Sequence, residues 1–220
     1  MKKTIKLEIP TSYSDISLRT YLLLQEDLKT YVDDNEAQVA FMLHHLCNIP
    51  IEDIKDIAKQ SHALLEEKLM AFLENREYPI QKFITIDGVE YGFEPNLNEM
   101  SYGAYMDIVK YDTIQIDANW PKIMSILYRP ITNKGIGGTY AIEKYDGKID
   151  EEKWLNVKMD IHFGTLFFFV RLLMDCHLSI LSSLKETAVG TSLHTILEKS
   201  GEAMQQSLNS RTMILGTLMK

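Results

Sequence analysis

The chain has 220 residues, of which 45% are hydrophobic and 25% are charged, a composition typical of a globular protein with a sizeable core. Its 31 acidic and 23 basic side chains give a net charge of −8, which argues against broad electrostatic binding to nucleic acid. Two widely separated cysteines, Cys47 and Cys176, match no metal-ligand or redox spacing, so we expect buried thiols in a reducing compartment and no disulfide.

The N-terminal third predicts one short strand followed by helices. "TIKLEI", residues 4–9, alternates at period two and ends at Pro10; it lacks the continuous apolar run of a signal peptide, so we expect the protein to stay where it is made. Capping residues and apolar stripes at helical spacing then predict four helices. The first should begin at a capping serine or aspartate and the second at a capping asparagine. They cover residues 14–32, 35–50, 51–59 and 61–77.

The middle of the chain predicts a hairpin and a short helix. "FITIDGVEYGF", residues 83–93, is two alternating runs joined by Asp87 and Gly88, a dipeptide that supplies the positive φ angles of a two-residue turn. "EMSYGAYMDIVKY", residues 99–111, indicates a short helix rich in tyrosine, a residue that suits cores and protein interfaces alike.

The stretch "YDTIQIDANWPKIMSILYRPI", residues 111–131, predicts a two-turn amphipathic helix. Asp117 or Asn119 can cap its start, and Pro121 fits the first turn. At 100° per residue the apolar face comprises Trp120, Ile123, Met124 and Leu127, and the polar face Lys122, Ser125 and Arg129. Pro130 disfavours helical geometry at Arg129, so we expect the helix to exit into a loop.

The last third predicts a loop, a second hairpin arm and long helices. Residues 133–150 combine a flexible glycine-rich loop with the alternating arm "TYAIEKY". Residues 160–186 predict a helix that is apolar around most of its circumference, so other helices or subunits must cover it. Charged residues interrupt its centre, which favours a core or interface helix over a membrane span. Past Gly190 a weaker, more polar helical tail follows. The thin polar stripe of the long helix comprises Arg171, Asp175, Ser179, Ser182 and Glu186.

These elements predict an α+β, mostly α-helical fold, a helical cluster with one or two small antiparallel β-hairpins. We expect a single domain over residues 1–220, with a possible subdivision into an N-terminal helical cluster (1–80), a hairpin and short-helix segment (81–150) and C-terminal long helices (151–220).

No set of residues predicts catalysis, a cofactor or a metal site. His44, His45 and Cys47 crowd one helical turn, but adjacent histidines point about 100° apart and no further ligand completes a tetrahedral zinc site. "KGIGGTY" resembles a phosphate-binding loop only in composition. We therefore expect a non-enzymatic protein whose distinctive residues serve packing or interfaces. These are Trp120, Ile123, Met124, Leu127, Tyr128, Phe167, Phe168 and Phe169.

Three stretches resemble virion or assembly proteins of tailed bacteriophages. They are "IDGVEYGFEPNLNEMSYGAYMDIVKY", "WPKIMSILYRPI" and "MDIHFGTLFFFVRLL", which span roughly residues 80–175. In that group a tyrosine-glycine segment before a short helix leads into an "M-x-x-LYRP" element. The chain looks most like a protein of the head-to-tail neck in crAss-like short-tailed phages, and a tail assembly chaperone is the close alternative.

The resemblance implies a structural connector subunit in the head-to-tail region of the virion, made in the host bacterial cytoplasm. Such a subunit forms a homo-oligomeric ring, contacts the portal and other neck or tail proteins, meets genomic DNA only as passing cargo and has no membrane partner. A chaperone would instead bind an apolar segment of a tail protein and be absent from mature particles. Large apolar faces and an acidic charge are compatible with the ring.

Overall fold

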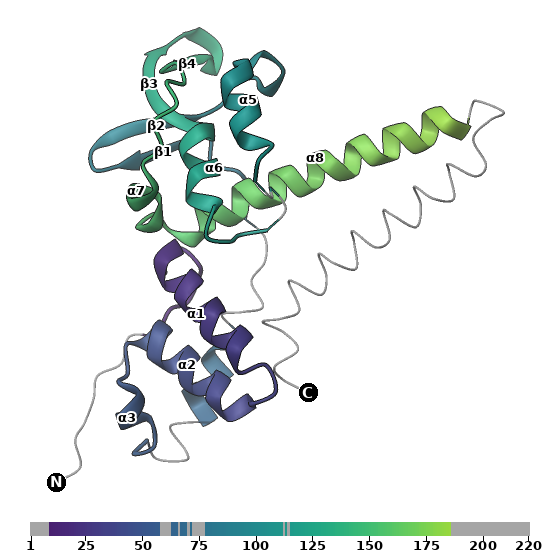
Figure 1. The fold of residues 1–220 in the computed structure, drawn as a ribbon. Coiled ribbons are helices and arrows are strands. Elements are labelled where there is room, and N and C mark those ends of the chain that lie inside the picture. Colours follow the sequence, from purple (N-terminus) through teal and green to yellow (C-terminus); the bar gives the residue numbers. More distant parts are fainter. Residues whose placement is uncertain are drawn as a thin grey trace. The chain divides into compact units, whose positions relative to one another are not determined.

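The computed structural model of the chain confirms the α+β, mostly helical class (Figure 1). It describes residues 9–57, 63–65, 67–69, 71, 78–111, 113 and 115–185, with the side chains of the last helix described to Asp175 and at Leu178. The predicted tail past Gly190 and most of the predicted strand 4–9 lie outside these residues. The chain divides into two compact units, residues 1–166 and 167–220.

The first unit begins with a helical cluster. Helix α1 (Leu18–Thr30) packs against α2 (Asn35–Cys47), and the short α3 (Ile51–Ile54) follows. Helical residues at 63–65, 67–69 and 71 agree with the fourth predicted helix. The shared core of α1 and α2 is aliphatic, as the stripes predict. It includes Leu24, Leu28, Met42, Leu43 and Leu46.

The helix caps differ from the prediction by one to three residues. Ser17 caps α1, because its hydroxyl accepts a hydrogen bond from the backbone N–H of Thr20, whereas Asp15 closes the turn before it. Asp34 caps α2 through the N–H of Ala37 at 2.9 Å, so the expected cap Asn35 is instead the first helical residue.

One four-stranded antiparallel sheet lies in the first unit, in the order β1-β2-β3-β4. Its strands are β1 (Phe83–Ile86), β2 (Val89–Phe93), β3 (Tyr128–Lys134) and β4 (Tyr140–Ile142). The predicted hairpin is confirmed: Asp87 and Gly88 have φ angles of 52° and 77° between β1 and β2. The two predicted hairpins thus join into one sheet through the pairing of β2 with β3.

The expected loop after residue 129 is wrong. Helix α6 (Trp120–Leu127) leads directly into β3, where Pro130 lies opposite Tyr91. Proline disfavours a continuing helix, but its fixed φ angle is compatible with an extended strand. The carbonyl of Pro130 accepts a hydrogen bond of 2.9 Å from the N–H of Glu143, which holds the start of the β3–β4 hairpin together.

Five further helices are described, of which η2 lies within the β3–β4 hairpin and α8 continues into the second unit. They are η1 (Leu97–Glu99), α5 (Tyr102–Ile108), η2 (Ile136–Gly138), α7 (Glu151–Leu155) and α8 (Met159–Lys185). The helix predicted at 99–111 is confirmed as α5. Backbone hydrogen bonds from Leu18 to Val157 and from Met159 to Ile16, both 3.0 Å, tie the start of α1 to the α7–α8 junction.

Candidate functional site

The stretch "WPKIMSILY", residues 120–128, lies largely in the interior of the first unit. The expected burial of Trp120, Ile123, Met124 and Leu127 is observed, and Tyr128 is buried beside them. Pro121 and Ile126 are buried as well, so the buried surface of α6 is wider than one helix face. This stretch therefore packs as core in the single chain.

A buried histidine on α8 meets this core. The indole Nε1 of Trp120 donates a hydrogen bond of 3.2 Å to Nδ1 of His162, so Nδ1 is an acceptor and the neutral ring carries its proton on Nε2. Burial lowers the pKa of His162 to about 3, although the carbonyls of Trp154 and Val157 act in the opposite direction. His162 is therefore neutral near pH 7 and joins α8 to α6 through its hydrogen bond with Trp120.

A chain of polar contacts fixes the start of α8 beside the segment that enters β1. The Tyr128 hydroxyl donates to the carbonyl of Gln81 at 2.8 Å and lies 3.3 Å from Oγ1 of Thr165. The Gln81 amide donates to Asp160 at 2.8 Å. Burial raises the pKa of Tyr128 to about 12, so its hydroxyl stays protonated. These hydrogen bonds hold Gln81, Tyr128 and Thr165 together inside the protein, while Oδ1 of Asp160 is buried without a hydrogen-bond partner.

Arg129 forms an ion pair that the sequence did not predict. It lies in β3 rather than on a helix, and its guanidinium donates to the carboxylate of Glu94 and, at 2.8 Å, to the carbonyl of Ile126. Both side chains are largely buried. Glu94 stands 35 positions earlier, so no local signal could have paired them.

The phenylalanines of the predicted interface set belong to the second unit. Phe169 is buried, whereas Phe167 and Phe168 are half-buried. The rings of Phe168 and Phe169 meet edge to face at 5.6 Å between centroids.

Helix α8 leaves apolar side chains exposed in the single chain. Arg171 and Asp175 are exposed, as the predicted polar stripe requires. In the part of α8 whose side chains the structure describes, several aliphatic side chains also contact solvent in the single chain. They are Leu172, Leu173, Met174 and Leu178, here called the α8 apolar segment.

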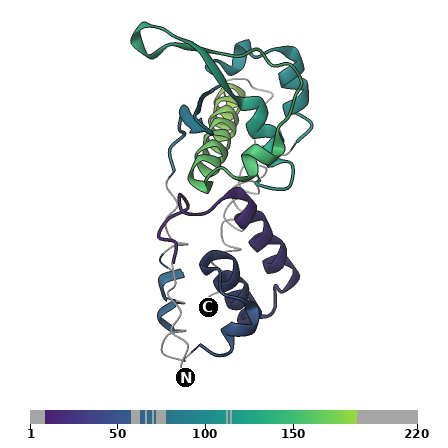
Figure 2. The same ribbon diagram turned by 90° about the vertical axis from the view of Figure 1, so that its left-hand side faces the viewer.

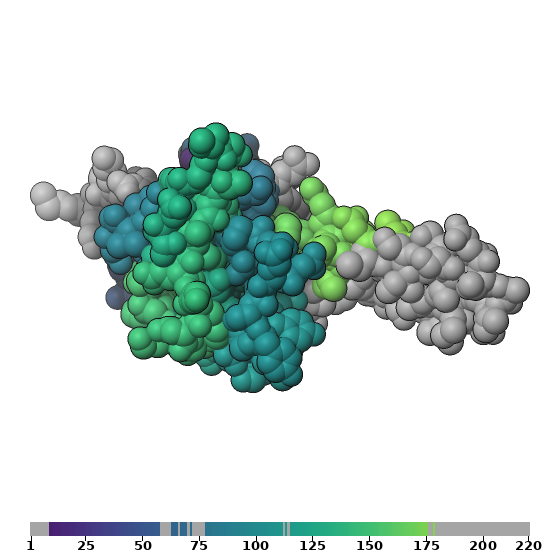
Figure 3. Space-filling model, turned by 90° about the horizontal axis from the view of Figure 1, so that it is seen from above, coloured from purple at the N-terminus to yellow at the C-terminus, as the bar shows by residue number. Residues whose placement is uncertain are grey.

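A second exposed apolar surface lies on α5. Tyr102 is 76% exposed, and its neighbours at helical spacing are exposed too, while Ala104 and Ile108 on the opposite side are buried. The exposed set, here called the α5 stripe, comprises Tyr102, Tyr105, Met106 and Val109. Figure 3 shows α5 beside the segment that follows β4, and the Tyr145 hydroxyl donates to Asp107 at 2.7 Å there.

The glycine-rich loop is a closed turn with one apolar side chain at its apex. The N–H of Gly135 donates to the carbonyl of Thr139 at 2.8 Å, and the Thr139 hydroxyl donates to the carbonyl of Ile136 at 3.1 Å. Ile136 is 99% exposed. We call residues 135–139 the hairpin tip. Figure 2 shows the β3–β4 hairpin projecting from the rest of the sheet.

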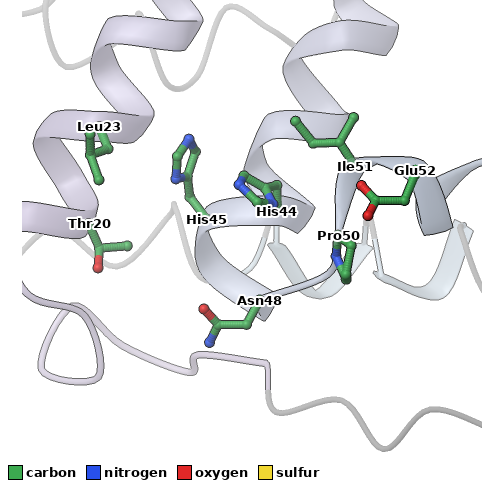
Figure 4. A pocket seen from close by; sticks show the side chains of 8 residues that line it. All are labelled: Thr20, Leu23, His44, His45, Asn48, Pro50, Ile51 and Glu52. Atoms are coloured by element: carbon green, nitrogen blue, oxygen red, sulfur yellow. The ribbon is translucent and has the colours of Figure 1, made fainter.

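A pocket of about 500 Å³ lies where α1, the end of α2 and the start of α3 meet (Figure 4). We call it the α1–α3 pocket. Its apolar wall comprises Leu23, Pro50 and Ile51, and its polar wall His44, His45 and Glu52. His44 is hydrogen-bonded to the carbonyl of Ile49 at 2.8 Å.

Nε2 of His45 is hydrogen-bonded to a carboxylate oxygen of Asp27 at 2.6 Å, so the imidazoles of His44 and His45 both have partners. Within the described part of the chain, no three His, Cys, Asp or Glu side chains are placed to hold a metal ion.

Two further findings concern the whole described chain. No helix among the described residues is both long and apolar enough to cross a membrane. Comparisons of the sequence with protein-family models and curated proteins, and of the structure with solved structures, found no match.

Proposed function

We propose that this protein acts through assembly, as a non-enzymatic, ring-forming subunit of the head-to-tail connector of a phage virion. Its partners are further copies of itself, the portal and other neck or tail proteins, and DNA passes through the ring as cargo. The "SILYRPI" element and the tyrosine-glycine segment before it support this proposal by their resemblance to phage virion proteins.

One structural observation carries the proposal. The α5 stripe and the α8 apolar segment are exposed in the single chain. The stripe combines aromatic and aliphatic side chains at helical spacing, and the α8 segment is wholly aliphatic. Contiguous exposed apolar surface is typical of protein–protein contact sites, and tyrosine and methionine are enriched at them. A subunit with two such surfaces on different elements can contact two neighbours, as a ring requires.

The interior polar groups support a structural role. Trp120 with His162, Tyr128 with Gln81, and Arg129 with Glu94 each bond within the protein, so their polar atoms hold elements together. Buried polar partners of this kind favour one packing arrangement over alternatives.

A tail assembly chaperone is the second candidate, and the composition of the α8 apolar segment favours it. The flexible, unbranched side chain of Met174 adapts to differently shaped apolar partners, which suits transient binding of another protein's segment. As a chaperone, the protein would leave before the particle matures.

Mass measurement separates these candidates. The purified chain should form a defined oligomer whose population rises with concentration, and mass spectrometry of purified particles should detect many copies per virion. A protein that stays monomeric at every concentration and is missing from mature particles would contradict the ring proposal. The chaperone would then be the favoured function.

A variant pair tests whether the α5 stripe takes part. Tyr105→Glu places a charge in the stripe and should weaken self-association at least about tenfold, the effect of a lost contact of about 1.4 kcal/mol. Val32→Glu makes the same kind of change at an exposed apolar residue that follows α1, outside the stripe, and should associate like the wild type.

A further inference from the structure

One turn of α8 is uncovered on every side in the single chain. All five residues from Arg171 to Asp175 are exposed, and three of them are apolar. Successive helix positions are about 100° apart, so five consecutive positions cover more than a full circle. Water therefore contacts leucine and methionine side chains around this whole turn, which favours its cover by a second apolar surface.

The α5 stripe is a surface of matching form. Its members follow the i, i+3, i+4, i+7 spacing of one helix face. At about 1.5 Å per residue the stripe is about 10 Å long, and the α8 apolar segment, from Leu172 to Leu178, is about 9 Å long. The two surfaces can therefore lie along one another over their whole lengths, as packed helices do.

Opposite charges lie beside the two surfaces. Glu99 is exposed and lies three residues before the α5 stripe, so it stays within about 11 Å of the first tyrosine. Arg171 is exposed and directly precedes the α8 apolar segment. Among the described residues neither of these two side chains has an ion-pair partner, whereas Asp107 and Lys110 pair with each other and Asp175 makes an interaction of its own.

These two charges select both a partner and an orientation. A negative charge beside one apolar surface and a positive charge beside the other favour their contact. Both charges precede their surface in the chain, so they meet only when the two helices run parallel. In that orientation Arg171 approaches the ring of Tyr102, and an arginine guanidinium is attracted to the face of a tyrosine ring.

We propose that the α5 stripe of one copy packs in parallel against the α8 apolar segment of a second copy, with Glu99 and Arg171 paired at one end. This inference rests on the proposed ring function and names the contact that builds the ring. Stripe and segment are different patches of the same chain, so the contact is head-to-tail, as a cyclic ring requires.

Two variants and their mixture test the contact by mass photometry and analytical ultracentrifugation. Tyr105→Glu disables the stripe and Leu178→Glu disables the α8 segment, at positions more than half exposed, where the single chain leaves the new charge in water. Val32→Glu, 63% exposed and outside both surfaces, is the matched control. Each disabled variant should associate at least about tenfold more weakly than the wild type and the control. In the equimolar mixture each chain keeps one intact surface, so one-to-one heterodimers and nothing larger should form.

A charge exchange tests the orientation. Glu99→Arg and Arg171→Glu should each weaken association about two- to fivefold, because each converts an exposed ion pair into a pair of like charges. A chain that carries both substitutions restores the pair with its signs exchanged and should associate like the wild type. A double variant that associates more weakly than either single variant would overturn the parallel arrangement.

The outcomes separate this contact from the ring proposal. If the wild type assembles but the mixture contains no heterodimer, the contact is wrong and the ring proposal stands. If Leu178→Glu assembles like the wild type, the stripe binds another surface and the assignment of α8 as its partner is wrong. A wild-type chain that never assembles, with no heterodimer in the mixture, contradicts both proposals.

Discussion

Alanine at Gly164 should destabilise the protein, whereas alanine at Gly103 should stabilise it slightly. Both glycines lie in helices, Gly164 in α8 and Gly103 in α5. A Cβ atom at Gly164 would lie 2.5 Å from the carbonyl oxygen of Pro79, while one at Gly103 would contact nothing. The same substitution therefore isolates the close approach of α8 to the segment before β1.

Two opposing effects set the change in the free energy of unfolding that each substitution causes. Replacing a helical glycine with alanine gains up to about 1 kcal/mol in helix propensity, and less near a helix end such as Gly103. At Gly164 this gain is opposed by overpacking, which costs about 1–3 kcal/mol and is at the upper end here because the contacted atom is backbone. We expect Gly164→Ala to lower the free energy of unfolding by about 1–2 kcal/mol. Gly103→Ala should raise it by roughly 0.3 to 1 kcal/mol.

Urea unfolding followed by tryptophan fluorescence measures both variants. Trp120 and Trp154 are the chain's two tryptophans, and both are buried in the first unit, where Gly164 also lies. A Gly164→Ala protein at least as stable as the wild type would refute the close contact between α8 and Pro79.

Three further predictions concern stability. Gly88→Val should lower the thermal midpoint, since a β-branched residue resists a φ of 77°; an unchanged midpoint would count against the turn. Leu127→Ala should cost about 2–5 kcal/mol in urea, whereas Leu23→Ala, at a half-exposed site, should cost clearly less. The pKa of His162 is about 3 when folded and 6.5 ordinarily, so the unfolded chain binds the proton first. Stability should be full above pH 6.5 and fall by up to about 1.4 kcal/mol per unit toward pH 3. His162→Asn should flatten that slope, and an unaltered slope would exclude His162 as its source.

Local sequence signals predicted the elements whose cause is local. Asp87 and Gly88 predicted the first hairpin because positive φ angles at both positions depend on those two residues alone. Pro121 and the apolar spacing around it predicted α6 and the burial of its core residues. The caps were displaced by one to three residues because several serine, aspartate and asparagine side chains compete at each helix start.

Contacts between distant residues could not be predicted. The pairing of Tyr91 with Pro130 joins strands from two hairpins, and nothing near Pro130 distinguishes a strand from a loop. The partners of His162 and Arg129 are 42 and 35 positions away. The closed shape of the hairpin tip depends on the Thr139 hydroxyl, whereas the glycines alone predicted only a loop.

The buried thiol of Cys47 allows local opening of α2 to be measured by chemical labelling. The thiol is buried, and burial raises its pKa to about 11, so almost none of it is the thiolate that alkylating reagents attack. Labelling of the native protein must therefore wait until the end of α2, where Cys47 lies, opens locally. The rate of label incorporation, read by mass on the peptide that contains Cys47, gives the free energy of that local opening. The natural sequence thus contains a site-specific probe of sub-global motion in the helical cluster, and it requires no engineered residue.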